Sequence, residues 1–194
     1  MSVIGVVLAG GKSSRMGQDK ALLRLPNGKT LLEHSIELLN GLGLDEVVVS
    51  RSPDITPSLI NIRCIGDEYS ELGPLAGIAA VITQYPAASA LLVIPTDLPM
   101  LSESPLLELC STGIKDQCST YFERHYLPCY LQLNSQLKDY IQLQLDNHQA
   151  KRSIAGLLAN ANAIALKLSD QKQLLNANTA ADWEKLTSLL SLPN

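Results

Sequence analysis

The stretch Val3-Ile4-Gly5-Val6-Val7-Leu8-Ala9-Gly10-Gly11-Lys12-Ser13-Ser14-Arg15-Met16-Gly17-Gln18-Asp19-Lys20 decides the fold. Its first part, up to Leu8, is an apolar run rich in β-branched residues, which predicts a buried strand. The run then enters a glycine-rich loop that carries the cations Lys12, Arg15 and Lys20. Backbone amides in such a loop can cradle phosphate oxygens, and the cations can neutralise them. The stretch therefore predicts a nucleotide-phosphate site directly after the first strand.

The spacing of the glycines excludes two common phosphate-binding loops. The Walker loop, G-x-x-x-x-G-K-[ST], fits the end Gly11-Lys12-Ser13, but its first glycine would fall at Val6. The dinucleotide fingerprint G-x-G-x-x-G is absent because Gly10 and Gly11 are adjacent. A glycine-rich turn with solvated lysines is the structural alternative, although three cations within nine residues are unusual in a turn.

The segment Leu8–Leu22 fits the pattern L-A-G-G-x-S-x-R-M-G-x-D-K-A-L at every specified position. This pattern resembles the signature of the molybdenum cofactor guanylyltransferase (MobA) family, within the nucleotidyltransferase superfamily. Sugar-nucleotide pyrophosphorylases share only its opening, and cytidylyltransferases usually have alanine at the position of Gly10. The resemblance implies a three-layer α/β/α Rossmann-like nucleotidyltransferase fold with a mainly parallel central sheet. It also implies one domain over residues 1–194, with a nucleotide-binding N-terminal half and an acceptor-binding C-terminal half.

Strand and helix patterns alternate along the chain, which by itself predicts a parallel sheet with helices on both faces. A capping box at Thr30 to Glu33 opens the first helix, and Pro74 lies in the first turn of the second. Expected strands are 3–8, 46–50, 61–65, 90–94, 119–122, 129–133 and 164–168; expected helices are 31 to 41 or 43, 74–84, a short one capped by Ser104-Pro105, 136–145, 153–158 and one opening at Thr179.

The composition fits a folded α/β protein and argues against several other classes. The chain has 194 residues, 46% of them hydrophobic, and no run near the roughly 18 apolar residues of a membrane span. A net charge of −4 argues against nucleic acid as a partner. The apolar N-terminal run lacks a preceding basic region, so we expect a cytoplasmic protein without a membrane partner. The four cysteines form no C-x-x-C pair and the histidines have no metal-ligand spacing.

Asp97 follows the apolar run Leu91 to Ile94, within Pro95-Thr96-Asp97-Leu98-Pro99. Ligands of open α/β sheets lie beyond the carboxyl ends of the strands, where the phosphate loop is also expected. An acidic side chain there repels phosphates unless a cation bridges the two, so we interpret Asp97 as a Mg²⁺ ligand. A turn aspartate between two prolines is the alternative. The resemblance supports the metal, because the metal-binding aspartate of the family falls at this position.

Two further segments gain a nucleotide role from the resemblance. It implies that Asp67 contacts the nucleotide and that the segment Gly73-Pro74-Leu75-Ala76-Gly77 lines the guanine pocket. From the residues alone, a solvated loop acid is the alternative interpretation of Asp67. The family often has asparagine where this chain has Ser50, so a nucleotide contact by Ser50 is left open. The expected nucleotide-binding residues are Leu8, Ala9, Gly10, Gly11, Lys12, Ser13, Arg15, Lys20, Ser50, Asp67, Gly77 and Asp97.

The acceptor side resembles the family less closely. Asn176-Ala177-Asn178-Thr179 matches its N-x-N-T motif, which implies that Asn176 and Asn178 face the molybdopterin, but the proline that usually follows is Ala180 here. The same residues could simply cap the last helix. The family's H-P-T motif is also replaced, by Leu127-Pro128-Cys129. Lys151 and Arg152 are candidate anion contacts for the acceptor, or the start of a helix.

The resemblance implies transfer of GMP from GTP to molybdenum-molybdopterin, with Lys20, Arg15 and Asp97 as catalytic residues and Mg²⁺ as cofactor. Molybdoenzymes or their delivery chaperones are the further partners it suggests. The acceptor phosphate is largely ionised near neutral pH, since its second pKa is about 6, so no general base is needed. Two alternatives stay open: a cytidylyl- or sugar-phosphate nucleotidyltransferase of the same fold, and a non-catalytic carrier of nucleotide and cofactor.

Overall fold

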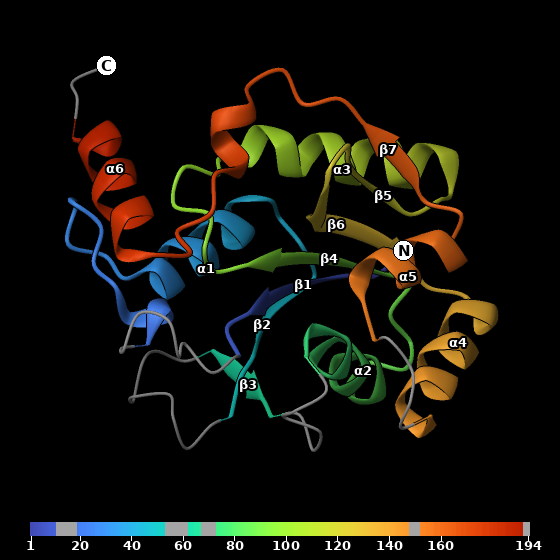
Figure 1. The fold of residues 1–194 in the computed structure, drawn as a ribbon. Coiled ribbons are helices and arrows are strands. Elements are labelled where there is room, and N and C mark those ends of the chain that lie inside the picture. Colours follow the sequence, from blue (N-terminus) through green and yellow to red (C-terminus); the bar gives the residue numbers. More distant parts are fainter. Residues whose placement is uncertain (11–18, 53–61, 67–72, 148–151, 192–194) are drawn as a thin grey trace.

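The structure, a computed structural model, describes residues 1–10, 19–52, 62–66, 73–147 and 152–191. Its centre is one seven-stranded sheet with the strand order β3-β2-β1-β4-β6-β5-β7, flanked by helices on both faces (Figure 1). The strands are β1 (Val3–Leu8), β2 (Glu46–Ser50), β3 (Arg63–Ile65), β4 (Ala90–Pro95), β5 (Thr120–Phe122), β6 (His125–Gln132) and β7 (Ile164–Leu166).

The first four strands form the parallel part of the sheet. β1 pairs in parallel with both β2 and β4, and β3 adds to β2 in the same direction. β6 is antiparallel to β4, its neighbour on one side. It is also antiparallel to β5, with which it forms a hairpin, and β7 joins β5 in parallel. The predicted mainly parallel sheet is thus confirmed, and β6, which runs against the other six strands, is the exception to the β-α-β order.

Two helical layers bury the two faces of the sheet. α1 (Leu31–Gly41) and α3 (Glu103–Asp116) share one apolar core, and α2 (Pro74–Gln84), α4 (Ser135–Asp146) and α5 (Ile154–Asn160) share the other. Successive side chains of a strand point to opposite faces, so Val7 of β1 joins the first core and Val6 joins the second. Both side chains are fully buried. This arrangement confirms the expected three-layer α/β/α architecture.

A third, smaller apolar cluster joins the last described helix to the segment that precedes α1. The last helix, α6 (Ala180–Leu190), packs Trp183 and Leu190 against Leu23, Leu25 and Leu31. These leucines lie just after the short 3-10 helix η1 (Lys20–Leu22) and at the start of α1. Figure 1 shows α6 beside this N-terminal segment, at the left of the sheet. A second 3-10 helix, η3 (Gln171–Leu174), precedes α6.

Helix starts follow the local capping signals, with one correction. The capping boxes at Thr30 with Glu33 and at Thr179 with Asp182 are both formed. The prediction of a short helix capped by Ser104-Pro105 was wrong, because α3 spans 14 residues and its cap is Ser102. Pro105 fits inside the first turn, where backbone N–H groups have no partner within the helix. Among the described residues, no helix is both long and apolar enough to cross a membrane.

Gly113 allows α3 to pack closely against β6, so we expect Gly113→Ala to destabilise the protein. A Cβ atom there would overlap the ring of Tyr130 and lie 3.0 Å from the carbonyl oxygen of Cys118. Tyr130 is fully buried and cannot move aside without disturbing the core. Overpacking of this kind costs about 1–3 kcal/mol, and better helix propensity offsets no more than about 1 kcal/mol. Urea denaturation followed by circular dichroism measures the change.

Gly41→Ala, at the end of α1, is the matched control. Its Cβ would meet only the carboxylate of Glu103, which is exposed and can move. We expect an unfolding free energy near or above that of the wild type for this variant. Equal stability of both variants and the wild type would contradict the close packing of α3 on β6.

Candidate active site

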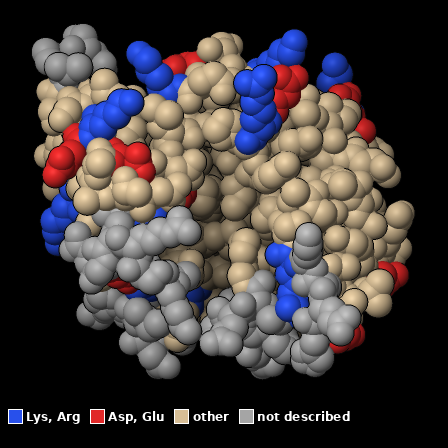
Figure 2. Space-filling view, in the orientation of Figure 1, with Lys and Arg blue, Asp and Glu red and all other residues tan. Residues whose placement is uncertain are grey.

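The carboxyl ends of β1, β2 and β4 meet at one edge of the sheet, because these strands run in the same direction. The backbone N–H of Ala9, one residue beyond β1, donates to the carbonyl oxygen of Ser50 at 3.1 Å and so holds the two strand ends together. Figure 2 shows a hollow near the centre of the face in view, and Figure 1, in the same orientation, places the central strands behind it. Ligands of such sheets bind in a crevice at this edge.

Three residues predicted to bind nucleotide pack together at the ends of β1 and β2. A Cβ atom at Gly77 would overlap the hydroxyl oxygen of Ser50 and lie 3.4 Å from Cδ2 of Leu8. Glycine at this position therefore lets α2 approach the strand ends closely. Ser50 is only 4% exposed, with its side chain against α2. The contacts give Ser50 and Gly77 a packing role, and their predicted nucleotide contacts stay predictions.

Lys20 opens η1 and reaches across to the C-terminal part of the chain. Its Nζ atom donates to Oδ1 of Asn178 at 3.0 Å, which joins residues 158 positions apart. Asp19, the preceding residue, caps η1 by accepting from the N–H of Ala21 at 3.1 Å. The structure thus brings a cation of the glycine-rich signature into contact with an asparagine of the predicted acceptor motif.

Asp97 lies two residues beyond β4 and contacts the same C-terminal segment. Its carbonyl oxygen accepts from the backbone N–H of Ala177 at 2.9 Å, and Ala177 is fully buried. The carboxylate oxygen Oδ1 of Asp97 is also buried, and no donor in the described part of the chain reaches it. A buried acceptor without a donor is costly unless a cation binds it. Asp97 therefore fits a Mg²⁺ ligand.

The described residues contain no group of three or more His, Cys, Asp or Glu side chains able to hold a metal. This is compatible with Mg²⁺, because Mg²⁺ is usually bound by one or two carboxylates together with water and substrate phosphates. Asp97 would supply the protein's carboxylate in such a site, and a nucleotide would supply the phosphate oxygens.

The segment that carries the two asparagines is held by α6. Thr179 caps α6, and its hydroxyl and backbone N–H both donate to the carboxylate of Asp182 at 2.8 and 2.9 Å. These hydrogen bonds hold the pKa of Asp182 below its usual value, and the positive charge of Lys20 lowers that pKa further. Asn176 and Asn178 are both exposed. The alternative reading of this motif as a helix cap therefore holds for Thr179, while Asn178 meets Lys20.

Several predicted site residues lie outside the described residues. Gly11, Lys12, Ser13 and Arg15 belong to the loop of the signature, Asp67 to the segment after β3, and Lys151 to the segment before α5. Gly10 is described and exposed, and the nearest atom of the described residues to a Cβ atom added there would be the carbonyl oxygen of Ser50, at 3.8 Å. The described part of the fold therefore has room for a methyl group at Gly10.

Arg152 makes structural contacts at the end of α4. Its Nε donates to the carbonyl oxygen of Gln144 at 2.9 Å, and one of its terminal nitrogens donates to that of Asn147 at 2.8 Å. These carbonyls end α4, where a cation also interacts favourably with the helix dipole. Figure 1 places α4 on the opposite side of the sheet's centre from α6. These contacts give Arg152 a structural role, and its predicted acceptor contact stays a prediction.

Arg51 is a charged residue of this region that the sequence analysis did not single out. It directly follows β2, its side chain is buried, and its guanidinium pairs with Asp19. One signal was available in the sequence: a lone cation directly after the apolar strand Glu46–Ser50 occupies the sheet edge where ligands bind.

The two buried cysteines are poor nucleophiles. All four cysteines are free, and burial raises the pKa of Cys110 to about 11 and also raises that of Cys129. The thiols of these two residues are therefore protonated near neutral pH, and the thiolate is the reactive form. The chemistry that this site can support is electrostatic: a cation, Lys20, and a carboxylate suited to a metal, Asp97, at the edge where phosphates would bind.

Known proteins resemble this chain in sequence and in fold. The model of the MobA-like NTP transferase domain matches residues 5–163. The molybdenum cofactor guanylyltransferase of Xanthomonas euvesicatoria pv. vesicatoria is 36% identical over 184 residues, which cover 94% of this chain and 93% of that protein. A probable molybdenum cofactor guanylyltransferase of Mycobacterium tuberculosis is 29% identical and covers 91% of this chain and 89% of that protein.

The similarity of the fold extends to solved structures with low sequence identity. Molybdopterin-guanine dinucleotide biosynthesis protein A from Archaeoglobus fulgidus superposes with a TM-score of 0.79 at 21% identity, covering 97% of this chain and 98% of that one. A CMP:2-keto-3-deoxy-manno-octonic acid synthetase superposes with a TM-score of 0.72 at 16% identity, covering 98% and 99%. At these identities the structures establish a shared fold, while the family model and the Xanthomonas relative establish kinship. The chain therefore belongs to the MobA-like NTP transferase family and is an enzyme of the nucleotidyltransferase class.

Proposed function

We propose that this enzyme transfers GMP from GTP to molybdenum-bound molybdopterin, forming the guanine dinucleotide form of the cofactor and pyrophosphate. The observation that carries the proposal is the contact between Lys20, from the nucleotide signature, and Asn178, from the motif expected on the acceptor side. It puts the two predicted halves of the site within one hydrogen bond of each other. The names of the curated relatives from Xanthomonas and Mycobacterium support the choice of substrates.

The proposed reaction is an in-line displacement at the α-phosphorus of GTP. An oxygen of the acceptor's terminal phosphate forms the new bond to that phosphorus, and the bond to the oxygen that bridges the α- and β-phosphates breaks. Pyrophosphate leaves with the electron pair. The acceptor phosphate is largely ionised at neutral pH, its second pKa being about 6, so no side chain needs to take a proton from it. The barrier lies in bringing two polyanions together in line.

The residues of the site would lower this barrier by position and charge. Lys20 would place its ammonium against the α-phosphate and the departing pyrophosphate, at a point fixed by Asn178. Arg15 and Lys12 would hold the β- and γ-phosphates. Asp97 would hold Mg²⁺, which neutralises phosphate oxygens when bound. Charges arranged in advance around the developing negative charge are the largest contribution to many enzyme rates.

The base of the nucleotide is the first test of the proposal. We expect GTP to bind more tightly than CTP, ATP or UTP, by on the order of 100-fold, because a polar pocket rejects a base that leaves its buried groups unpaired. Titration calorimetry with each triphosphate and Mg²⁺ measures the four affinities. Equal affinity for CTP would contradict the guanylyl assignment and favour the cytidylyl alternative.

Gly10→Ala extends this test to the position where cytidylyltransferases usually carry alanine. Among the described residues, the atom nearest to the added methyl group would lie at 3.8 Å, which is an ordinary van der Waals contact. We expect an unchanged unfolding midpoint and a weaker affinity for GTP. An unchanged GTP affinity would show that Gly10 is not close to the nucleotide.

Asp97→Ala should abolish pyrophosphate release and remove the Mg²⁺ dependence of triphosphate binding. The fold should survive, because Asp97 follows β4 and its contact with Ala177 is made by the backbone. Asp116→Ala, at the exposed end of α3, removes the same charge and should retain activity. Near-normal pyrophosphate release by Asp97→Ala would place the metal elsewhere.

Lys20→Ala should slow the chemical step more than it weakens GTP binding, whereas Arg15→Ala should also weaken GTP binding. Negative charge builds on the leaving pyrophosphate in the transition state, and loss of one such contact typically raises the barrier by about 3–4 kcal/mol. Single-turnover rates at saturating GTP separate the two effects. If Lys20→Ala recovers the wild-type rate once GTP is saturating, its role in the chemical step is refuted.

A further inference from the structure

Arg51 is a buried cation that belongs to neither the glycine-rich signature nor the asparagine motif. The residue is 5% exposed, and its backbone N–H donates to the carbonyl oxygen of Ile65, at the end of β3, at 3.0 Å. Its position is therefore fixed by the edge of the sheet, and its guanidinium lies at the strand ends that form the candidate site. A buried guanidinium is costly unless it is paired and hydrogen-bonded.

Among the partners of this guanidinium are groups from two places in the described part of the chain. Nη1 donates to the carbonyl oxygen of Ala9 at 3.3 Å and to Oδ1 of Asp19 at 3.2 Å. Nη2 donates to Oδ2 of Asp19, which completes a two-pronged ion pair. Arg51 thereby links the residue that follows β1 to the residue that precedes Lys20. A planar guanidinium can make these bonds together, whereas an ammonium cannot match the same geometry.

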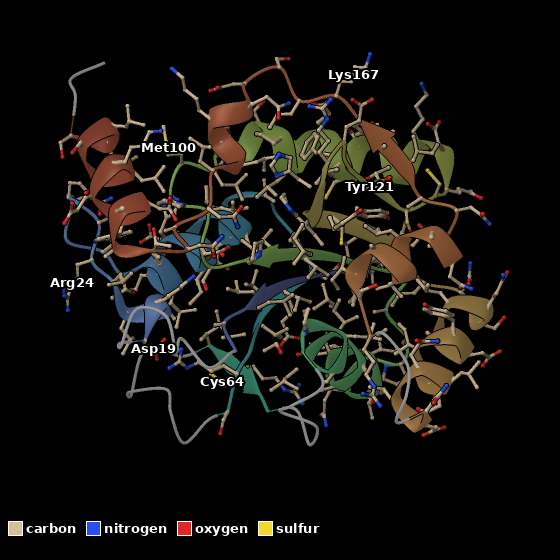
Figure 3. All side chains as sticks on the ribbon, viewed as in Figure 1. Asp19, Arg24, Cys64, Met100, Tyr121 and Lys167 are labelled. Carbon is tan, nitrogen blue, oxygen red and sulfur yellow. The ribbon has the colours of Figure 1, made fainter. Side chains whose placement is uncertain are left out.

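Asp19 connects Arg51 to η1 and therefore to Lys20. The same carboxylate that Arg51 binds accepts from the N–H of Ala21 and so caps η1, whose first residue is Lys20. The Nζ atom of Lys20 then meets Asn178 at 3.0 Å. Arg51, Asp19, Lys20 and Asn178 thus form one chain of contacts that starts at the sheet and ends at the C-terminal segment. Figure 3 shows Asp19 at the left of the sheet, near β3, the strand that carries Cys64.

The ion pair also suits the charge of the substrate. A carboxylate directly beside Lys20 would repel a triphosphate if it stood alone, and the side chain of Asp19 is 32% exposed. The guanidinium of Arg51 neutralises it, so Asp19 can cap η1 without placing an uncompensated negative charge next to the phosphates. The ion pair therefore fixes the start of η1 and adds no net charge beside the phosphates.

We propose that Arg51 is a positioning residue for the transfer reaction: through its two-pronged bond to Asp19 it fixes η1, and thereby the ammonium group of Lys20, at the site. The proposal rests on the proposed function, since it assigns to Lys20 the step described there. Arg51 would act on the phosphates only through Lys20. Its loss therefore acts on the rate of transfer through Lys20.

The first experiment compares Arg51→Met with the wild type and with Arg63→Gln. Met fills much of the same space without the guanidinium. Arg63 lies on β3, exposed, with its side chain over Tyr85 and bonded to Gln84, away from η1.

For Arg51→Met we expect kcat for pyrophosphate release to fall on the order of 100-fold, as expected when a catalytic group is misplaced by about 1 Å. The affinity for GTP should change by less than about threefold, since the guanidinium of Arg51 is paired with Asp19 and would act on the phosphates through Lys20. Arg63→Gln should resemble the wild type, and a wild-type kcat for Arg51→Met would overturn the proposal.

The second experiment repeats the substitution in the Lys20→Ala background. If Arg51 acts through Lys20, its loss should slow this variant by less than about threefold, because residues that act as a unit are not additive. A purely structural role of Arg51 predicts the opposite result, in which the two losses multiply. That multiplication would overturn the proposal. Thermal denaturation of each variant establishes that the rates refer to folded protein.

If Arg51→Met does not fold, Arg51→Lys replaces it in these experiments. It keeps the positive charge beside Asp19 but loses the planar fork, so we expect it to fold with kcat still lowered at least about tenfold. A rate equal to that of the wild type would show that charge alone suffices and would overturn the positioning role.

A readout without turnover separates this proposal from the proposed function. The N–H of Ala21 is protected by Asp19, so its hydrogen exchange should be faster in Arg51→Met than in the wild type and unchanged in Arg63→Gln. If the wild type releases no pyrophosphate from GTP, the proposed function fails, and the exchange result still tests whether Arg51 orders η1. Unchanged exchange at Ala21 would overturn the proposal whatever the substrate.

Discussion

The burial of β1 on both faces is the constraint on which the rest of this structure depends. Val6 and Val7 point to opposite cores and neither is exposed, and β2 and β4 occupy both hydrogen-bonding edges of the strand. A strand enclosed in this way has no position for a charged side chain along its length. Polar groups must therefore lie beyond its ends and those of its neighbours. Parallel pairing brings the carboxyl ends of β1, β2 and β4 together, so Arg51 and Asp97 come from separate strands to one edge of the sheet.

Local signals predicted most of the elements, and the misses have local causes too. β1, β2 and α2 have the predicted bounds, because each is a compact apolar run with a clear beginning and end. The start of α3 was misplaced because proline can occupy any position in the first turn of a helix, so Ser104-Pro105 resembled a cap when Ser102 was the cap. β6 was predicted too short, since its first residues are more exposed than the rest.

The candidate site was predictable only where a motif or a strand end marks it. Asp97 could be predicted as a site residue because it comes directly after a buried strand. Lys20 could be predicted because it belongs to the signature. The contact of Lys20 with Asn178 could not be read from spacing, because the fold alone brings residues 158 positions apart together. Arg51 was missed because nothing in its local sequence shows that Asp19 is its partner. Arg152 has contacts at the end of α4 that its sequence did not predict, and its acceptor role stays a prediction.

The C-terminal segment reaches the candidate site from beyond the residues that the family model matches. The MobA-like domain matches residues 5–163, yet Ala177 binds the backbone of Asp97 and Asn178 binds Lys20. This segment is held in place by α6, which packs on the leucines after η1. The helix at the far end of the chain therefore stabilises the N-terminal residues of the site, and the two halves expected to bind nucleotide and acceptor meet through it.

The packing of α6 also gives the protein an intrinsic fluorescent probe. Trp183 is the only tryptophan in the sequence, and it lies in α6 against the cluster of Leu23, Leu25 and Leu31. Indole emission depends on the polarity around the ring, and this ring is partly buried beside the segment that begins with Lys20. The tryptophan fluorescence of the unmodified protein therefore originates beside the candidate active site, and a shift of its spectrum on adding a ligand reports on the contact between α6 and the segment around η1 without any attached dye.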